Sequence, residues 1–299
     1  MSHHVTPTPT LYRGRFAPSP TGPLHFGSLV SALASYLDAK KHQGCWIIRI
    51  EDVDGTRCKP VFAEQILETL NSYQLFSDEP VRTQSHHTDT YEQHLQHLKD
   101  QHQAFPCNCT RQSLAQSAGN HPLECDSTTA EPHSWRLKPS DLVYQYKDEI
   151  QGTLVFTDDL KNNSPVLKRK DGYFSYQIAV VVDDHLQNIN HLVRGADLIE
   201  TTAQQLHLYH LFGWTPPSIC HIPLITNDVG DKISKQNHAK AIPNGDLPTL
   251  LRALHYLKID LNQPKNIHEA LTLAIKAWNP SQLTGIQSSP LEEQDLPLI

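Results

Sequence analysis

Residues 11–52 of the chain read LYRGRFAPSPTGPLHFGSLVSALASYLDAKKHQGCWIIRIED, and this stretch decides the fold. Residues 11–17 predict a short strand, and a Pro/Gly loop follows over residues 18–23. Residues 28–41 place apolar side chains at helical spacing, and residues 45–50 form the nearly continuous apolar run typical of a buried parallel strand. Strand, loop, helix and strand form a βαβ unit, which predicts an α/β sheet with crossover helices.

The rest of the sequence continues this mixture of patterns without an internal repeat. Beyond the irregular stretch that holds three cysteines, residues 135–167 contain short mixed runs with turn signals at Gly152 and at Asn162 and Asn163. Helices are predicted over residues 60–75, 90–103, 173–182, 203–212 and from 246 onward, and strands over residues 191–194 and 219–225. The α/β prediction therefore extends over most of the chain.

Composition narrows the class of protein. Of the 299 residues, 38% are apolar and 19% charged, which is a globular profile, and no run of about 18 apolar residues predicts a membrane span. The polar first ten residues lack the apolar core of a signal peptide, so a cytoplasmic location is expected. The net charge of −7 argues against a protein that coats DNA or RNA, although it permits a local basic patch. Neither a DNA nor a membrane partner is expected.

The turn between the first strand and the first helix carries Leu24-His25-Phe26-Gly27-Ser28. A helix N-terminus offers backbone N–H groups and the positive end of the helix dipole, which suit a phosphate. Gly27 allows a ligand close to the backbone, Ser28 can cap the helix, and His25 can donate to a phosphate oxygen. Alone, so short a motif also fits a Ser-capped helix with an incidental histidine.

A second candidate phosphate-binding motif is Lys232-Ile233-Ser234-Lys235-Gln236. Lysines in a polar loop act as flexible point charges and suit a mobile clamp on a polyphosphate. By itself the pentapeptide is weak evidence, because a solvated run of charges explains most pentapeptides of this kind. Together with the upstream turn, it indicates nucleotide binding far more strongly.

With both motifs in this order, the sequence resembles the class I aminoacyl-tRNA synthetases. Residues 24–28 stand at the place of that family's first signature, and residues 232–236 at the place of the second. Three further stretches, residues 15–22, 49–54 and 193–197, resemble the glutamyl/glutaminyl branch. The resemblance covers about residues 11–245 and implies a Rossmann-like catalytic domain that uses ATP with Mg²⁺.

Within that branch the sequence is similar to the glutamyl-Q tRNA(Asp) synthetase family, which lacks the anticodon-binding domain of a full glutamyl enzyme. Only residues 236–299 follow Lys235, fewer than a separate domain of about 100 residues would need. The resemblance implies a ligase that activates L-glutamate with ATP in the absence of tRNA. It further implies transfer of the glutamyl group to queuosine at the wobble position of tRNA(Asp).

The resemblance also implies a division of the chain and roles for its motifs. Residues 11–104 and 191–245 would form the two halves of the catalytic domain, residues 105–190 a zinc-containing insertion that handles the acceptor, and residues 246–299 a helical C-terminal segment. The catalytic residues would be His25, Lys232 and Lys235. The ATP site would be formed by His25, Gly27, Ser28 and Lys235.

A glutamate site needs an arginine for a carboxylate and an acceptor for the ammonium group. We expect Arg194 to supply the first and Glu51 the second, because Glu51 follows a buried strand at the edge of the sheet where ligands bind. The residues alone favour the alternative that Glu51 ends a strand and that Arg194 pairs on the surface. By resemblance, the glutamate contacts are Arg15, Phe16, Ala17, Pro18, Ser19, Glu51, Tyr176 and Arg194.

Four zinc-ligand residues fall close together in the irregular stretch: Cys107, Cys109, His121 and Cys125. Four such side chains suit a closed, structural tetrahedral site, and three reduced cysteines beside an incidental histidine are the alternative. The spacing resembles the zinc site of the glutamyl-Q family, in which a tyrosine commonly stands at the place of His121. Because histidine is the commoner zinc ligand, we expect this departure to strengthen binding.

Three other functions remain compatible with these residues. The chain could be a truncated glutamyl-tRNA synthetase that charges tRNA(Glu), or a non-catalytic paralogue that senses glutamate or its adenylate. It could also be a zinc-stabilised RNA-binding module, although its acidic balance speaks against that role.

Overall fold

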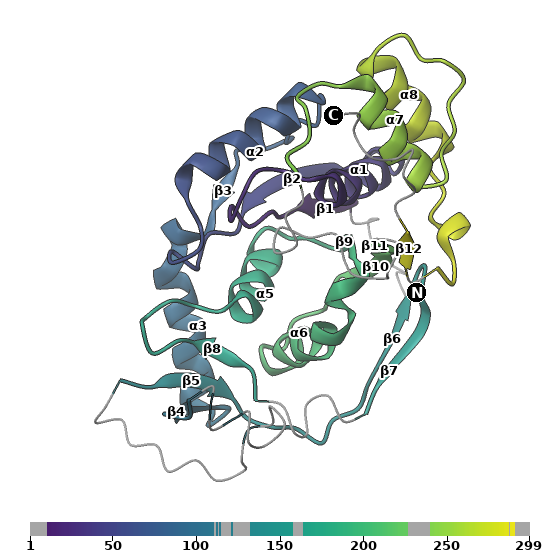
Figure 1. Cartoon of the computed structure of the whole chain (residues 1–299). Coiled ribbons are helices and arrows are strands. Elements are labelled where there is room, and N and C mark those ends of the chain that lie inside the picture. The colour runs from purple at the N-terminus through teal and green to yellow at the C-terminus, as the bar shows by residue number, and fades with distance from the viewer. Residues whose placement is uncertain are drawn as a thin grey trace, which may run out of the picture.

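The structure is a computed structural model that describes residues 11–110, 112, 114, 121, 132–157, 164–226, 240–286 and 288–290. The predicted βαβ unit is confirmed: strand β1 (Arg13–Phe16), helix α1 (Phe26–Lys41) and strand β2 (Cys45–Ile50) follow one another, and β1 and β2 pair in parallel. Strand β3 (Arg82–Thr83) extends this sheet beside β2. Figure 1 shows α1 running along the sheet.

A second parallel pair of strands lies beside this sheet. Strand β9 (His191–Gly195) pairs with β10 (Ser218–Ile222), and the backbone N–H of Asn190 donates to the carbonyl oxygen of Arg13 at 3.1 Å, which sets the start of β9 beside β1. The single strand predicted over residues 219–225 is wrong in one respect. It is divided at Pro223, which has no N–H for a sheet hydrogen bond, and continues as β11 (Leu224–Thr226), which pairs with β12 (Ser288–Pro290).

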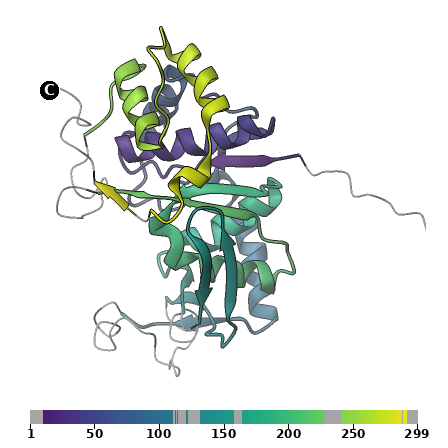
Figure 2. The same ribbon diagram turned by 90° about the vertical axis from the view of Figure 1, so that its right-hand side faces the viewer.

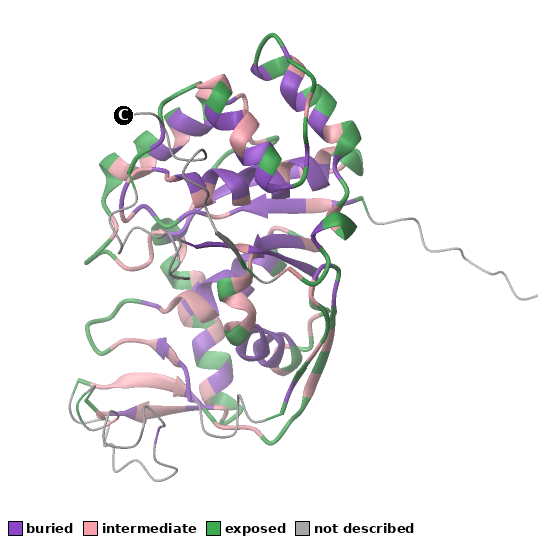
Figure 3. Ribbon diagram, turned by 45° about the vertical axis from the view of Figure 1, so that its right-hand side comes forward, coloured by how far each residue is buried: buried purple, intermediate pink, exposed green. Residues whose placement is uncertain are grey.

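The alternation of side chains gives this sheet two different faces. Trp46, Ile48 and Val193 belong to the core that α1 shares with the sheet, whereas Ile47 and Leu192 point to the opposite face. The core on the first face also takes in α2 (Pro60–Ser72), α7 (Leu247–Tyr256) and α8 (Ile267–Ala277). Figure 3 shows the buried residues concentrated in α1 and the central strands.

The opposite face is covered by the middle of the chain, which Figures 1 and 2 show below the central sheet. Its helices are α3 (Thr88–Asp100), α5 (Tyr176–Leu186) and α6 (Ile199–Leu211), with short 3₁₀ turns at Gln84–His87 and Ala196–Leu198. A small antiparallel sheet contains β4 (Ala104–Cys107), β5 (Ser134–Leu137) and β8 (Val166–Lys168). The hairpin of β6 (Tyr144–Asp148) and β7 (Gly152–Phe156) runs along one side.

Two sequence predictions in this region need correction. Cys107 ends a regular strand, although no regular structure was expected there, because β4 gains its hydrogen bonds from β5, a strand distant in sequence. Helix α5 begins at Tyr176 rather than residue 173 and continues through Asp183 and Asp184, because the buried Arg49 pairs with both carboxylates. Within the described residues, none of the helices combines the length and apolar character needed to cross a membrane.

The helical segment after residue 246 is attached to helix α1 by a buried tryptophan. Trp278 is fully buried, and its indole Nε1–H donates to Asp38 Oδ1 of α1 at 2.8 Å. The Tyr12 hydroxyl donates to the other oxygen of the same carboxylate. Asp38 therefore joins the first strand, the first helix and the end of α8 through one buried acceptor. The chain continues into a 3₁₀ turn at Pro280–Leu283.

Candidate functional site

A layer of charged side chains lies on the sheet face opposite α1. Because alternate residues of a strand share a face, Arg15 of β1, Arg49 of β2, Arg194 of β9 and His221 of β10 all point toward α5 and α6. Glu51 follows directly at the end of β2 and is buried. Charged groups are costly to bury unless they are paired, so this layer is expected to be a network or a binding site.

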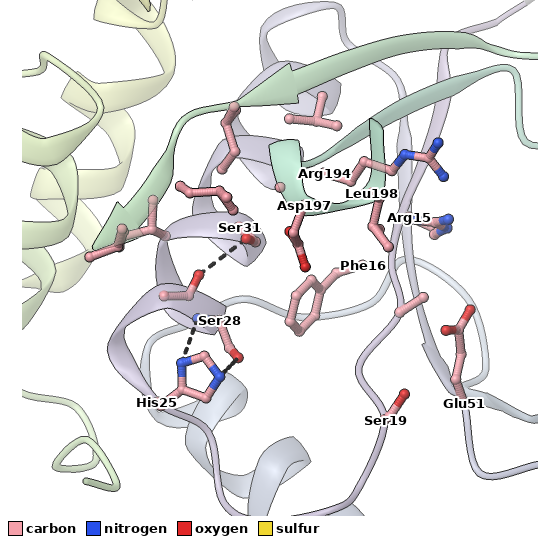
Figure 4. Close-up of a pocket in the computed structure, with 18 of the residues that line it drawn as sticks. Arg15, Phe16, Ser19, His25, Ser28, Ser31, Glu51, Arg194, Asp197 and Leu198 are labelled. Carbon is pink, nitrogen blue, oxygen red and sulfur yellow. Dashed lines mark hydrogen bonds between the residues drawn. The ribbon is translucent and has the colours of Figure 1, made fainter. Parts of the chain in front are cut away.

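A pocket of about 610 Å³ opens at the carboxyl ends of these strands (Figure 4). Open α/β sheets bind their ligands at this edge. The pocket brings together residues that lie far apart in the sequence, from β1 to β9. Those predicted site residues that line it are Arg15, Phe16, Ala17, Ser19, His25, Gly27, Ser28, Glu51, Tyr176 and Arg194.

Pro18, a predicted glutamate contact, is not among the described residues that line the pocket. Pro18 is buried, and its carbonyl oxygen accepts from the backbone N–H of Glu51 at 3.0 Å, which ties the loop to the end of β2. Lys232 and Lys235 lie outside the described residues. Pro18 can therefore act through the shape of the loop.

Two arginines of the layer are held by carboxylates. Arg15 contacts Asp184 through two hydrogen bonds (3.2 and 3.3 Å), and Arg49 contacts Asp184 at 2.8 Å and Glu51 at 2.9 Å. Burial acts to raise the pKa of Asp184, but Arg15 and Arg49 outweigh it and lower that pKa below its ordinary value. Burial raises the pKa of Glu51, against the opposing effect of Arg49 and Arg15. Asp184 is thus a fixed anion, and Glu51 is the carboxylate of this group that lines the pocket.

Arg194 differs because its partners in the described part of the chain are neutral. It is 3% exposed, and its Nε–H, Nη1–H and Nη2–H groups donate to His221 Nε2 (3.0 Å), Gln205 Oε1 (2.6 Å) and Thr202 Oγ1 (2.9 Å). Among the described residues, these bonds leave one further N–H on Nη1 and one on Nη2. A bidentate contact with a carboxylate needs two N–H groups. Burial lowers the pKa of Arg194, yet a guanidinium stays charged in proteins. The pocket therefore contains a buried positive charge ready for an anionic ligand.

The N-terminus of α1 forms another part of the pocket wall and corrects one prediction. His25, rather than Ser28, is the N-cap residue: its Nδ1 accepts from the backbone N–H of Ser28 at 3.2 Å (Figure 4). Its Nε2 lies 2.9 Å from Ser28 Oγ. The helix begins two residues before Ser28 because the histidine ring can satisfy a backbone donor as a serine hydroxyl would. Gly27 and Ser28 accordingly lie in the first helical turn.

Comparison with known proteins agrees with this geometry. Residues 12–124 and 120–250 match the family of tRNA synthetases class I (E and Q), catalytic domain. The glutamyl-Q tRNA(Asp) synthetase of Klebsiella pneumoniae (strain 342) is 42% identical over 291 residues, which are 95% of this chain and 99% of that protein. The enzyme of the same name from Escherichia coli (strain K12) is 42% identical over 290 residues, 95% of this chain and 93% of that one.

The chain belongs to the glutamyl-Q tRNA(Asp) synthetase family of class I synthetases. The predicted fold class, a Rossmann-like class I synthetase domain with a helical C-terminal end, is confirmed. A glutamate tRNA ligase from Elizabethkingia meningosepticum CCUG26117, solved in complex with its amino acid, has the same fold, with a TM-score of 0.77 and 24% identity over 96% of this chain and 68% of that one.

This member of the glutamyl-Q family also contains a cluster of metal-ligand side chains. One ligand atom each from Cys107, Cys109 and His121 lies within 4.8 Å of the others, and Cys107 Sγ is 3.0 Å from His121 Nε2. The guanidinium Nε–H of Arg136 donates to Cys107 Sγ at 3.2 Å. Sulfur and nitrogen donors this close together fit zinc. Cys125, the fourth predicted ligand, lies outside the described residues.

Sequence reasoning missed the groups that hold the arginines of the glutamyl-Q pocket. They are Asp184, Thr202, Gln205 and His221, together with Asp148, which holds His221, and Arg49, which shares Asp184 with Arg15. A usable signal existed for two of them: Arg49 interrupts the apolar run of residues 45–50, and Asp184 extends the apolar run of α5. A charge within a buried apolar run implies a buried partner. The partner itself depends on tertiary packing and cannot be assigned from one sequence.

Proposed function

We propose that this chain is a ligase that activates L-glutamate with ATP, without tRNA, and then transfers the glutamyl group to queuosine at the wobble position of tRNA(Asp). The proposal rests on one observation above all: the buried guanidinium of Arg194 has only neutral partners among the described residues, and Arg194 lines the same pocket as Glu51. The 42% identity to enzymes named for this reaction supports the same assignment.

Arg194 and Glu51 give the pocket opposite charges for the two ends of an amino acid. The free N–H groups of Arg194 would bind a glutamate carboxylate bidentately, and Glu51 would accept hydrogen bonds from the ammonium group. Arg15 is already engaged by Asp184, so it would add positive potential to the site. Tyr176 and Ser19 supply hydroxyl groups that can orient the substrate.

The ATP side of the pocket would be the N-terminus of α1. Its first-turn backbone N–H groups, near Gly27, and its dipole favour phosphate oxygens. His25 caps this helix and can donate through Nε2–H once that group turns from Ser28 toward the triphosphate. Lys235, with Lys232 behind it, would neutralise the departing pyrophosphate. Mg²⁺, held mainly by the phosphates, would supply further neutralisation of the phosphate charge.

In the activation step, an oxygen of the glutamate α-carboxylate attacks the α-phosphorus of ATP, and pyrophosphate leaves. No protein nucleophile is needed, so the side chains contribute positioning and charge stabilisation. In the transfer step, a hydroxyl of the queuosine base attacks the glutamyl carbonyl carbon, and AMP leaves. In both steps the protein has to hold the attacking group in line with the atom that it attacks.

The remaining assignments follow from the same family. Cys107, Cys109, His121 and Cys125 would hold one structural zinc ion, which would stabilise the fold around the end of β4. The insertion of residues 105–190 would handle the acceptor, between catalytic halves at residues 11–104 and 191–245, and residues 246–299 would brace α1. We propose a cytoplasmic location, where tRNA, ATP and glutamate occur together.

The test of this proposal is glutamate-dependent exchange of labelled pyrophosphate into ATP, measured with and without tRNA. Exchange without tRNA supports the proposal, and Arg194→Gln, which removes the guanidinium but keeps a polar side chain, should abolish it. Exchange that requires tRNA(Glu) would favour an ordinary glutamyl-tRNA synthetase body. Absence of exchange with every amino acid and tRNA would favour a non-catalytic paralogue.

A further inference from the structure

The guanidinium of Arg194 is held from behind by a buried pair that does not line the pocket. His221 lies on β10 directly opposite Arg194 of β9 in the parallel register, so their side chains share one face of the sheet. His221 Nε2 accepts from Arg194 Nε–H at 3.0 Å, and its Nδ1 lies 2.6 Å from Asp148 Oδ2. The side chains of His221 and Asp148 are fully buried.

Asp148 determines which ring nitrogen carries the proton. Its carboxylate accepts from the backbone N–H groups of Ile150 and Gln151 (2.9 Å each) and of His221 (3.1 Å to Oδ2), a donor set that suits the ionised form. The short contact with Nδ1 then requires Nδ1–H, which leaves the Nε2 lone pair for Arg194. An imidazolium ring would set a second N–H against the guanidinium donor, so His221 is neutral here.

We propose that Asp148 and His221 form a positioning pair that fixes the Arg194 guanidinium through an uncharged acceptor, so that its full positive charge remains available for the carboxylate of the amino-acid substrate. The proposal rests on the proposed function insofar as that substrate is glutamate. A carboxylate bound directly to Arg194 would also fix it, but it would satisfy the charge that the substrate needs. An unheld arginine would have to lose side-chain freedom on binding, which weakens affinity.

The pair also connects the amino-acid pocket to the β6–β7 hairpin. Asp148 is the last residue of β6, and the Tyr146 hydroxyl of the same strand donates to the carbonyl oxygen of Ile219 on β10. The hairpin therefore reaches the pocket through His221 rather than by touching the substrate. His221 acts through Arg194 and is a positioning residue, not a catalytic one.

Two substitutions of His221 separate its two hydrogen bonds. In His221→Asn the amide NH₂ can replace Nδ1–H and keep the Asp148 contact, but no acceptor reaches Arg194. In His221→Gln the longer side chain can place Oε1 near the position of Nε2 and restore the acceptor for Arg194. The inference predicts that His221→Asn raises the KM for glutamate about tenfold in pyrophosphate exchange, whereas His221→Gln stays within about threefold of the wild type.

The KM for ATP and the kcat should change by no more than about twofold in both variants, because neither touches the phosphates. Equal effects of the two substitutions on the KM for glutamate, or no effect of either, would overturn the inference while leaving the proposed function intact. Thermal unfolding of both variants identifies a general loss of structure, which would raise both KM values together.

A second readout does not depend on the identity of the substrate. The ¹⁵N chemical shifts of the His221 ring in the full chain, assigned with His221→Gln as the reference, report which nitrogen is protonated. The Nδ1–H neutral tautomer supports the positioning pair. An Nε2–H tautomer or an imidazolium near neutral pH would overturn it, even if the wild-type protein failed to activate glutamate.

Discussion

Gln205 offers the sharpest test of how Arg194 works, because one atom of its side chain can be exchanged for another of nearly the same size. Its Oε1 accepts from Arg194 Nη1–H at 2.6 Å, and its Nε2–H donates to Gln177 Oε1 at 3.2 Å. Gln205→Glu keeps the length of the side chain but introduces a carboxylate directly on the guanidinium. Arg194 would then be paired before the substrate arrives.

The cost to glutamate binding can be estimated from the geometry. A substrate carboxylate on the remaining N–H groups of Arg194 would lie about 5 Å from the introduced carboxylate, and at an effective dielectric constant of about 20 two such charges repel by roughly 3 kcal/mol. Since 1.4 kcal/mol corresponds to a tenfold change in an equilibrium constant, the KM for glutamate should rise about 100-fold. The guanidinium beside the introduced group keeps that group ionised.

Steady-state pyrophosphate exchange at varied glutamate and fixed, saturating ATP measures this effect. The matched control is Gln205→Met, a neutral side chain of similar length that removes the same hydrogen bonds and should raise the KM for glutamate only about tenfold. If the two variants behave alike, the charge of Arg194 does not govern binding. If Gln205→Glu binds glutamate as tightly as the wild type, Arg194 is not the carboxylate site.

Purified protein handled without chelator should contain about one zinc ion per chain by elemental analysis, and Cys107→Ser should lose it; a zinc-free wild type would refute the site. Burial lowers the pKa of His207 to about 4, so the unfolded chain binds more protons from about pH 6.5 down to pH 4, and stability falls as the pH falls through that range. Between pH 7 and pH 4, the unfolding free energy measured by urea titration should therefore fall by roughly 2 to 3 kcal/mol less in His207→Leu than in the wild type. An equal fall in the two proteins would count against this. Trp278→Ala should lower the unfolding free energy by about 3 to 5 kcal/mol, whereas a loss below about 1 kcal/mol would mean that the C-terminal helices do not brace α1.

The sequence predicts the central sheet well because its strands have clear local signals. The apolar run of residues 45–50 lies between a glycine and two carboxylates, and the helix of residues 28–41 has a regular apolar face, so β2 and α1 follow from short-range pattern alone. The ends of elements are less predictable. Helix α1 begins at Phe26 because the ring of His25 caps it, a role that the sequence assigned to Ser28.

The candidate site is predictable only in part, for a physical reason. Residues that line the pocket belong to compact motifs, and these motifs identify Arg15, Glu51 and Arg194. The groups that hold these side chains come from other elements through tertiary packing. His221 and Asp148 stand 73 positions apart and meet because a hairpin packs on β10. The sequence immediately around each of these two residues does not distinguish it from an ordinary polar position in a strand.

Transfer of glutamate to tRNA tests the central claim most directly. Purified chain, ATP and radiolabelled L-glutamate are incubated with tRNA(Asp) that carries queuosine, and in parallel with tRNA(Asp) that carries guanosine at the same position and with tRNA(Glu). The account predicts acid-precipitable label on the queuosine-containing tRNA(Asp) alone. Label on tRNA(Glu), or equal label on both forms of tRNA(Asp), would contradict it.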